Sequence, residues 1–238
     1  ACALVIFNHL PGYTLYSISK GGKQFFYMCL AMCTRINVPL FFMISGALLL
    51  SRNEEWTSVF KKRFTRIVML LLIFDFILML LNKLVNMKNG VEYEFSLSKY
   101  VHGFLENKIE YAGPYWYLYS YLGILFLLPL LQRVAKGITK NEIIALLTLH
   151  FITWSFFPLI NINMTKMQLP TFAFCGDFSV PFAYDKAFFY PILGYYLDNR
   201  IDIYKVKAKH LCGLIIAGVI GILLSDWCTY NDAILNGQ

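Results

Sequence analysis

Charged residues are scarce in this chain of 238 residues. Asp, Glu, Lys and Arg make up 15% of it, whereas a typical soluble domain contains about 25%. Hydrophobic residues make up 58% and aromatic residues 17% of the sequence, and the mean hydropathy is +0.56. This composition excludes an ordinary soluble globular protein and predicts an all-α, polytopic membrane helical bundle.

The motifs of the common soluble enzymes are also missing. The sequence contains no GxSxG nucleophile elbow, no Walker loop and no HExxH zinc motif. Its six cysteines have no CxxC or metal-ligand spacing, so we predict no metal site and interpret the four in apolar runs as small buried residues. No internal repeat supports an inverted-repeat transporter.

A net charge of +7 raises the question of nucleic-acid binding, which the charge distribution excludes. Loops 51–66, 132–140 and 199–210 hold twelve Lys and Arg against five acids, two of which lie at the loop edges, whereas the alternate loops with their flanks hold eight of each. This alternation follows the positive-inside rule and forms no continuous basic patch. We therefore expect an integral membrane protein, in a bacterial plasma membrane, with a cytoplasmic N-terminus.

Hydrophobic runs predict about seven transmembrane helices in a single domain over residues 1–238. The first, at 1–10, is too short to span a bilayer, and we expect it to be the second half of a longer helix. A short amphipathic helix is expected near 97–105. The other six spans are expected near 24–50, 67–84, 114–131, 142–160, 184–197 and 210–225.

The run around residues 24–50 has two features that are unusual for a helix that only crosses lipid. Arg35 places a charge at membrane depth, which costs about 2.5–3.5 kcal/mol and usually marks a functional cavity. Pro39 frees a backbone carbonyl that lipid cannot satisfy. Counting about 1.5 Å per residue puts Arg35 at a depth similar to that of His9, near the end of the first segment.

Three stretches resemble signatures of the acyltransferase-3 family of integral membrane acyltransferases. Val38-Pro-Leu-Phe-Phe-Met-Ile-Ser-Gly46 resembles its second-helix signature, and Arg63-Phe-Thr-Arg66 resembles the Arg-x-x-Arg motif at the base of its third helix. The aromatic start of 114–131 is similar to its fourth-helix signature, with Tyr117 replacing the usual Phe. The phrase beginning at Gly194 also resembles the family.

The resemblance implies an acyl-CoA donor, most often acetyl-CoA, and a cell-surface glycan or lipid-linked precursor as the acceptor. His9 corresponds to the family's proposed catalytic base, and Arg35 is expected either to keep its surroundings polar or to stabilise negative charge on the acyl oxygen. Arg63 and Arg66, with Lys62, would bind the phosphates of the donor. Because the family fold has about ten helices, we expect the sequence to be truncated at both ends.

Other interpretations remain open from the sequence. The basic cluster at 61–66 also fits the positive-inside rule alone. Asp75, a charge in mid-helix, is expected to pair with a basic group that the sequence does not identify. A transporter or flippase in which Arg35 and Asp75 bind a polar substrate, or a sensor or scaffold without activity, would use the same helices.

Overall fold

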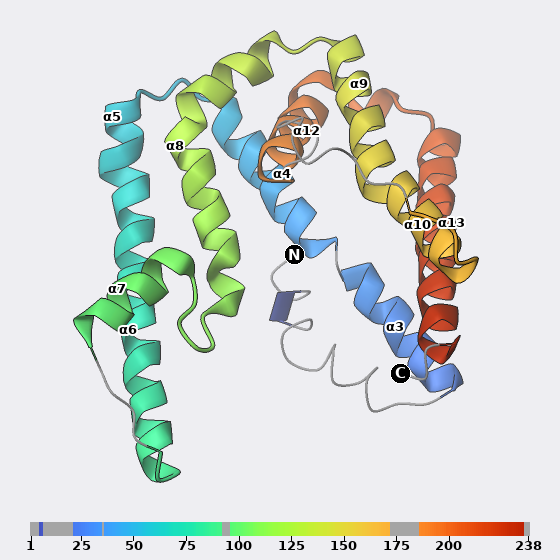
Figure 1. Cartoon of the computed structure of the whole chain (residues 1–238). Helices are drawn as coiled ribbons and strands as arrows, with labels where there is room; N and C mark the ends of the chain where they lie inside the picture. The colour runs from blue at the N-terminus through green and yellow to red at the C-terminus, as the bar shows by residue number, and fades with distance from the viewer. Residues whose placement is uncertain (1–4, 7–20, 35, 92–95, 172–185, 236–238) are drawn as a thin grey trace. The chain divides into compact units, whose positions relative to one another are not determined.

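The computed structural model describes residues 5–6, 21–34, 36–91, 96–171 and 186–235, and these residues form helices and connections without a strand (Figure 1). The predicted all-α fold is therefore confirmed for the described part of the chain. The fold divides into two compact units, one of residues 52–134 and one of residues 1–51 together with 135–238. The assignment of one domain to residues 1–238 stays a prediction.

The unit of residues 52–134 contains one long helix and a second helix, α8, that follows it in the chain. Its elements are α5 (Trp56–Val59), η2 (Phe60–Phe64), α6 (Thr65–Lys88), α7 (Leu97–Glu106), η3 (Gly113–Tyr115) and α8 (Trp116–Gly137), the last three residues of which belong to the other unit. The first three run on as a single helix of 33 residues. At about 1.5 Å per residue this helix is about 50 Å long, more than a bilayer's hydrocarbon core requires.

The short amphipathic helix expected near 97–105 is confirmed as α7. Its first turn is capped by Ser96, whose side chain accepts a hydrogen bond from the backbone N–H of Lys99. Its end is fixed by Asn107, which adopts the left-handed conformation that Asn tolerates (φ 51°). The Tyr100 hydroxyl donates to the Leu72 carbonyl at 2.7 Å, which ties α7 to α6.

The other unit contains the remaining helices of the chain. They are α3 (Gly22–Thr34), α4 (Asn37–Leu50), α9 (Lys140–Phe151), η4 (Ile152–Phe156), α10 (Phe157–Lys166), α12 (Lys186–Arg200), η5 (Ile203–Lys205) and α13 (Ala208–Leu235). Of the cysteines predicted to be buried, Cys29 is only half-buried on α3 and Cys212 is exposed on α13.

The prediction of one continuous helix over 24–50 is wrong, because α3 ends at Thr34 and α4 begins at Asn37. The interruption changes the role of Pro39. In the third position of α4 its missing N–H has no consequence, since the first-turn amides of any helix lack intrahelical acceptors. Inside one continuous helix, Pro39 would have removed a backbone hydrogen bond. Because the helix is interrupted just before it, Pro39 lies in the first turn of α4 and removes none.

Helices α4 and α12 pack through glycine in both directions. A Cβ atom built on Gly46 would overlap the backbone of Pro191, and one built on Gly194 would overlap the backbone of Met43. The absent side chains therefore allow the two backbones to touch. Phe42, Leu49, Phe189 and Ile192 are buried on these two helices.

Three helices in the described part of the chain are long and apolar enough to cross a membrane. They cover Trp56–Lys88, Gly113–Gly137 and Lys140–Thr165, and shorter apolar helices cover Asn37–Leu50 and Ala208–Gly221. These correspond to the second, third, fourth, fifth and seventh predicted spans. The sixth corresponds to α12, which has 15 residues, and the total of seven stays a prediction.

Candidate functional site

The structure describes part of the set of site residues that the sequence predicts. Lys62, Arg63 and Arg66 lie in the helix Trp56–Lys88. His9 and Arg35 lie outside the described residues, and the roles assigned to them stay predictions. The structure therefore gives the geometry of one part of the candidate site, the cationic end formed by Lys62, Arg63 and Arg66.

A π-helical turn carries two of the three basic residues, Lys62 and Arg63. It spans Phe60–Phe64 and interrupts an otherwise α-helical segment. Thr65 stabilises it, since both its backbone N–H and its hydroxyl donate to the carbonyl of Phe60, the hydroxyl at 2.8 Å. Such π-turns are rare and occur often at functional sites, because the extra residue turns neighbouring side chains away from their α-helical directions.

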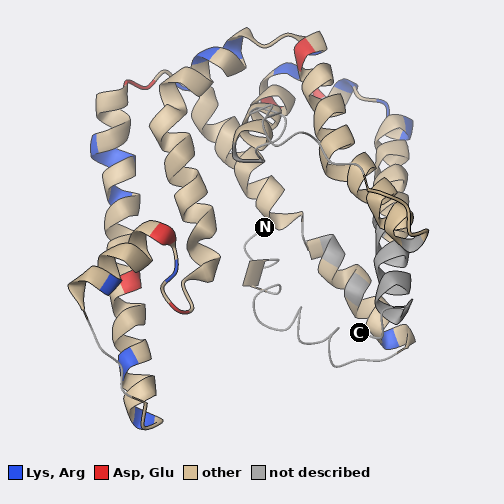
Figure 2. Ribbon diagram, in the orientation of Figure 1, with Lys and Arg blue, Asp and Glu red and all other residues tan. Residues whose placement is uncertain are grey.

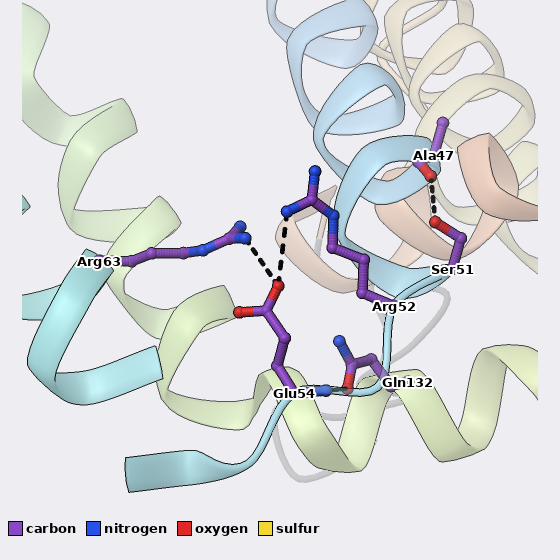
Figure 3. Close-up of polar contacts among 6 residues, drawn as sticks. All are labelled: Ala47, Ser51, Arg52, Glu54, Arg63 and Gln132. Atoms are coloured by element: carbon purple, nitrogen blue, oxygen red, sulfur yellow. Dashed lines mark hydrogen bonds and ion pairs between the residues drawn. The ribbon is translucent and has the colours of Figure 1, made fainter. Parts of the chain in front are cut away.

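Arg63 is held by a carboxylate from the preceding loop. Its Nη2 lies 2.6 Å from Oε1 of Glu54, and Nη1 of Arg52 lies 3.8 Å from the same oxygen. The backbone N–H of Glu54 donates to Oε1 of Gln132 on α8 at 3.2 Å, and the Gln132 side chain is buried. Figure 3 shows the two guanidinium groups approaching Glu54 from different sides.

The Arg63–Glu54 pair is partly buried, so its electrostatic attraction is stronger than that of an ordinary surface ion pair. The Arg63 side chain is 27% exposed and that of Glu54 is 17% exposed, so water screens their attraction less than it would screen a fully exposed pair. Glu54 fixes the direction of the guanidinium and compensates its charge. An anion that approaches Arg63 must compete with this carboxylate or use the remaining N–H groups.

Lys62 and Arg66 are exposed, and neither forms a hydrogen bond or an ion pair with the described residues. They therefore present uncompensated positive charge next to the Arg63–Glu54 pair. Aromatic side chains pack beside them: the rings of Phe60 and Phe126 meet edge to face with centroids 5.4 Å apart, which holds α8 against the π-turn. The arrangement is suited to binding phosphate groups at the end of a transmembrane helix.

Comparison with known proteins decides the family. The family model described as an acyltransferase domain, that of acyltransferase-3, matches residues 1–233. The chain belongs to the acyltransferase-3 family. No match was found among curated proteins or among solved structures. Together with its apolar helices, the family establishes this chain as an integral membrane acyltransferase in general terms.

Among the described residues, the side chain that contacts Asp75, the buried carboxyl of the acyltransferase, is a tyrosine, whereas the sequence led us to expect a basic group. Asp75 is 1% exposed on α6, and the Tyr119 hydroxyl lies 3.3 Å from its Oδ2. The same hydroxyl donates to the Phe104 carbonyl at 2.6 Å, so its single proton is shared between two acceptors. Oδ1 of Asp75 has no hydrogen-bond partner among the described residues. Tyr119 thus joins α6, α7 and α8 at one point.

A contact that the sequence did not reveal joins α9 to α12. Nε2 of His150 lies 3.1 Å from the Tyr190 hydroxyl, and its ring stacks on Phe189 with centroids 4.1 Å apart. A hydrogen bond satisfies both polar groups in an apolar setting. No sequence motif includes His150. Its position in the middle of an apolar run is the one sequence feature that could have indicated a role.

Proposed function

We propose that this membrane acyltransferase transfers an acetyl group from acetyl-CoA to a hydroxyl of a cell-surface glycan or of its lipid-linked precursor. The observation that carries the proposal is the pair Arg63 and Arg66 at the base of a transmembrane helix. One guanidinium is oriented by Glu54, and the other is exposed and uncompensated. Two arginines in this arrangement suit a ligand that carries several phosphate groups.

Each predicted site residue has a distinct task in this mechanism. Arg63 and Arg66, with Lys62, bind the phosphates of CoA while its thioester arm enters the helix bundle. His9 takes the proton from the acceptor hydroxyl as a general base. Arg35 either keeps the surroundings of His9 polar or stabilises the negative charge that develops on the acyl oxygen. No metal takes part in the proposed chemistry.

The proposed orientation places the donor on the cytoplasmic side of a bacterial plasma membrane. The basic loops 51–66, 132–140 and 199–210 face the cytoplasm, and so does the N-terminus. Acetyl-CoA is a cytoplasmic metabolite, so the phosphate-binding residues lie on the side from which it arrives. His9 and Arg35 then lie towards the outer leaflet, nearer a surface acceptor.

The test is release of free CoA thiol from acetyl-CoA by membranes that contain the full-length protein, with a cell-envelope extract as the acceptor. We expect His9→Ala to abolish acceptor-dependent release and Arg66→Gln to raise the KM for acetyl-CoA. His102→Ala is the matched control, because His102 is an exposed histidine on α7.

The possible results separate the competing functions. Equal release by the parent and by His9→Ala would remove His9 from the mechanism. An absence of both release and acetyl-CoA binding in the parent would overturn the proposal and leave a transporter or flippase of a polar or lipid-linked substrate. Binding without release in His9→Ala alone would assign the histidine to chemistry and the arginines to donor binding.

A further inference from the structure

A cleft between α9 and α12 lies within the unit of residues 1–51 and 135–238, and its lining includes none of the residues of the proposed donor site. Its volume is about 610 Å³, within the range of about 300–1,000 Å³ that small-molecule sites occupy. The lining changes in character from one end to the other. Charged residues come from the start of α9 and from the end of α12 with the loop that follows, and apolar side chains from both helices complete the wall.

The charged end of the cleft is positive. Lys140, Arg200 and Lys205 line it, with Asp202 as the one acid. Lys205 lies 3.1 Å from Asp202, and this exposed pair compensates its own charge. Lys140 forms no hydrogen bond or ion pair with the described residues. Arg200 donates to the backbone carbonyl of Lys136 at 3.0 Å, which fixes its side chain without neutralising it. Two uncompensated cations therefore face the cleft.

The apolar end of the cleft is open to the side. Ile144, Leu147 and Leu197 line it and remain 48%, 40% and 39% exposed. These residues lie on helices of a membrane protein, so we expect their exposed surfaces to face lipid rather than water. Leu147 is seven residues beyond Lys140 in the same helix, about 10 Å further along its axis. Because Lys140 begins a helix that is long and apolar enough to cross a membrane, we expect the cleft to run from the headgroup level towards the hydrocarbon region.

From this arrangement we infer that the cleft binds an anionic phospholipid, with its phosphate between Lys140 and Arg200 and an acyl chain along Leu147 and Leu197. Charge complementarity selects an anionic headgroup, since a zwitterionic lipid brings its own cation. In the described part of this unit, Lys and Arg residues lie where α8 leads into α9 and where α12 leads into α13 (Figure 2). Such clusters beside transmembrane helices attract the anionic lipids of the cytoplasmic leaflet. The inference does not depend on the identity of the acyl donor.

The experiment is native mass spectrometry of the purified full-length protein, titrated with phosphatidylglycerol or with phosphatidylcholine that has the same acyl chains. We expect the parent to retain phosphatidylglycerol about tenfold more strongly and the double variant Lys140→Gln/Arg200→Gln to lose this preference. Lys207→Gln/Lys209→Gln is the matched control, because it removes the same charge from the following segment outside the cleft. Lys140→Gln alone, which removes no hydrogen bond or ion pair with the described residues, guards against misfolding and should show an intermediate preference.

Two competition arms identify the source of the phosphate. Glycerol phosphate, which has the headgroup chemistry without the chains, should fail to displace the lipid. Displacement by it would show that the apolar wall contributes nothing and would overturn the inference. Displacement by acetyl-CoA would also overturn it, by assigning the cleft to the acyl donor. Equal loss of preference in the Lys207/Lys209 control would reduce the effect to general surface charge.

Discussion

Gly46 of α4 and Gly194 of α12 are reciprocal contact points, each placed where a side chain would enter the backbone of the other helix. Gly46 faces Pro191, and Gly194 faces Met43. Both glycines lie in stretches that resemble family signatures, so the resemblance in sequence corresponds here to a packing requirement. Backbone atoms cannot rotate aside as a flexible side chain can, and an added methyl group must push the helices apart.

Gly46→Ala and Gly194→Ala should each destabilise the protein by about 1–3 kcal/mol or more through this overlap. The measurement is the midpoint of thermal unfolding of the detergent-solubilised protein. Gly123→Ala on α8 is the control, since a Cβ at that position meets nothing within 4 Å. The control should be neutral or stabilised by about 0.5–1 kcal/mol, because alanine favours the helix. Unchanged midpoints for the Gly46 and Gly194 variants would contradict the close crossing.

Glu54→Gln should lower the KM for acetyl-CoA about three- to tenfold, because it removes the carboxylate that competes for Arg63. Steady-state kinetics of CoA release measures the change, and Arg63→Gln should shift KM in the opposite direction. Glu55→Gln is the matched control, since this exposed neighbour forms no ion pair with the described residues. A higher KM for Glu54→Gln would contradict this expectation and show that the orientation of the Arg63 guanidinium by Glu54 outweighs its competition with the phosphates.

Tyr119→Phe should destabilise the protein by about 1–3 kcal/mol, because it leaves the buried Asp75 and the Phe104 carbonyl without the hydroxyl that serves both. The comparison is Tyr115→Phe in the preceding turn, whose hydroxyl forms no hydrogen bond with the described residues. In the double variant Tyr119→Phe/Asp75→Leu we expect part of the loss to be recovered, because the unpaired carboxyl is gone. Thermal unfolding in detergent follows all three variants, and equal midpoints for Tyr115→Phe and Tyr119→Phe would oppose the assignment.

Thr139→Ala should cost about 1 kcal/mol by removing the capping box of α9. The Thr139 hydroxyl accepts from the Glu142 backbone N–H, and the Glu142 carboxylate accepts from the Thr139 backbone N–H at 2.6 Å. Thr148→Ala serves as control, because its hydroxyl bonds only to the Ile144 carbonyl within the same helix. Hydrogen exchange of the first turn of α9 should quicken in Thr139→Ala and not in Thr148→Ala.

Composition and hydrophobic runs were sufficient to predict the fold class and to locate most helices, because burial in lipid demands long apolar segments. They could not predict the interruption between Thr34 and Asn37, since apolar residues continue on both sides of it. Hydropathy also does not show where the backbone adopts a π-turn, as at Phe60–Phe64.

The basic residues of the site could be predicted from the sequence, but their partners could not. Lys62, Arg63 and Arg66 stand out as charges beside an apolar helix. The partner of Arg63 could not be predicted from the sequence. Glu54 is one of two adjacent acids in a loop, and only the fold distinguishes it from Glu55. The contact of Asp75 with Tyr119 joins residues 44 positions apart, and no local pattern encodes such a pairing.

The glycine contacts between α4 and α12 also have a mechanical meaning. Helices separated by side chains can slide or tilt while those side chains change rotamer, but two backbones in direct contact have no such freedom. We therefore expect helices α4 and α12 to move as one body. The α12 wall of the lipid cleft belongs to this body, so a ligand that displaces α12 must carry α4 with it.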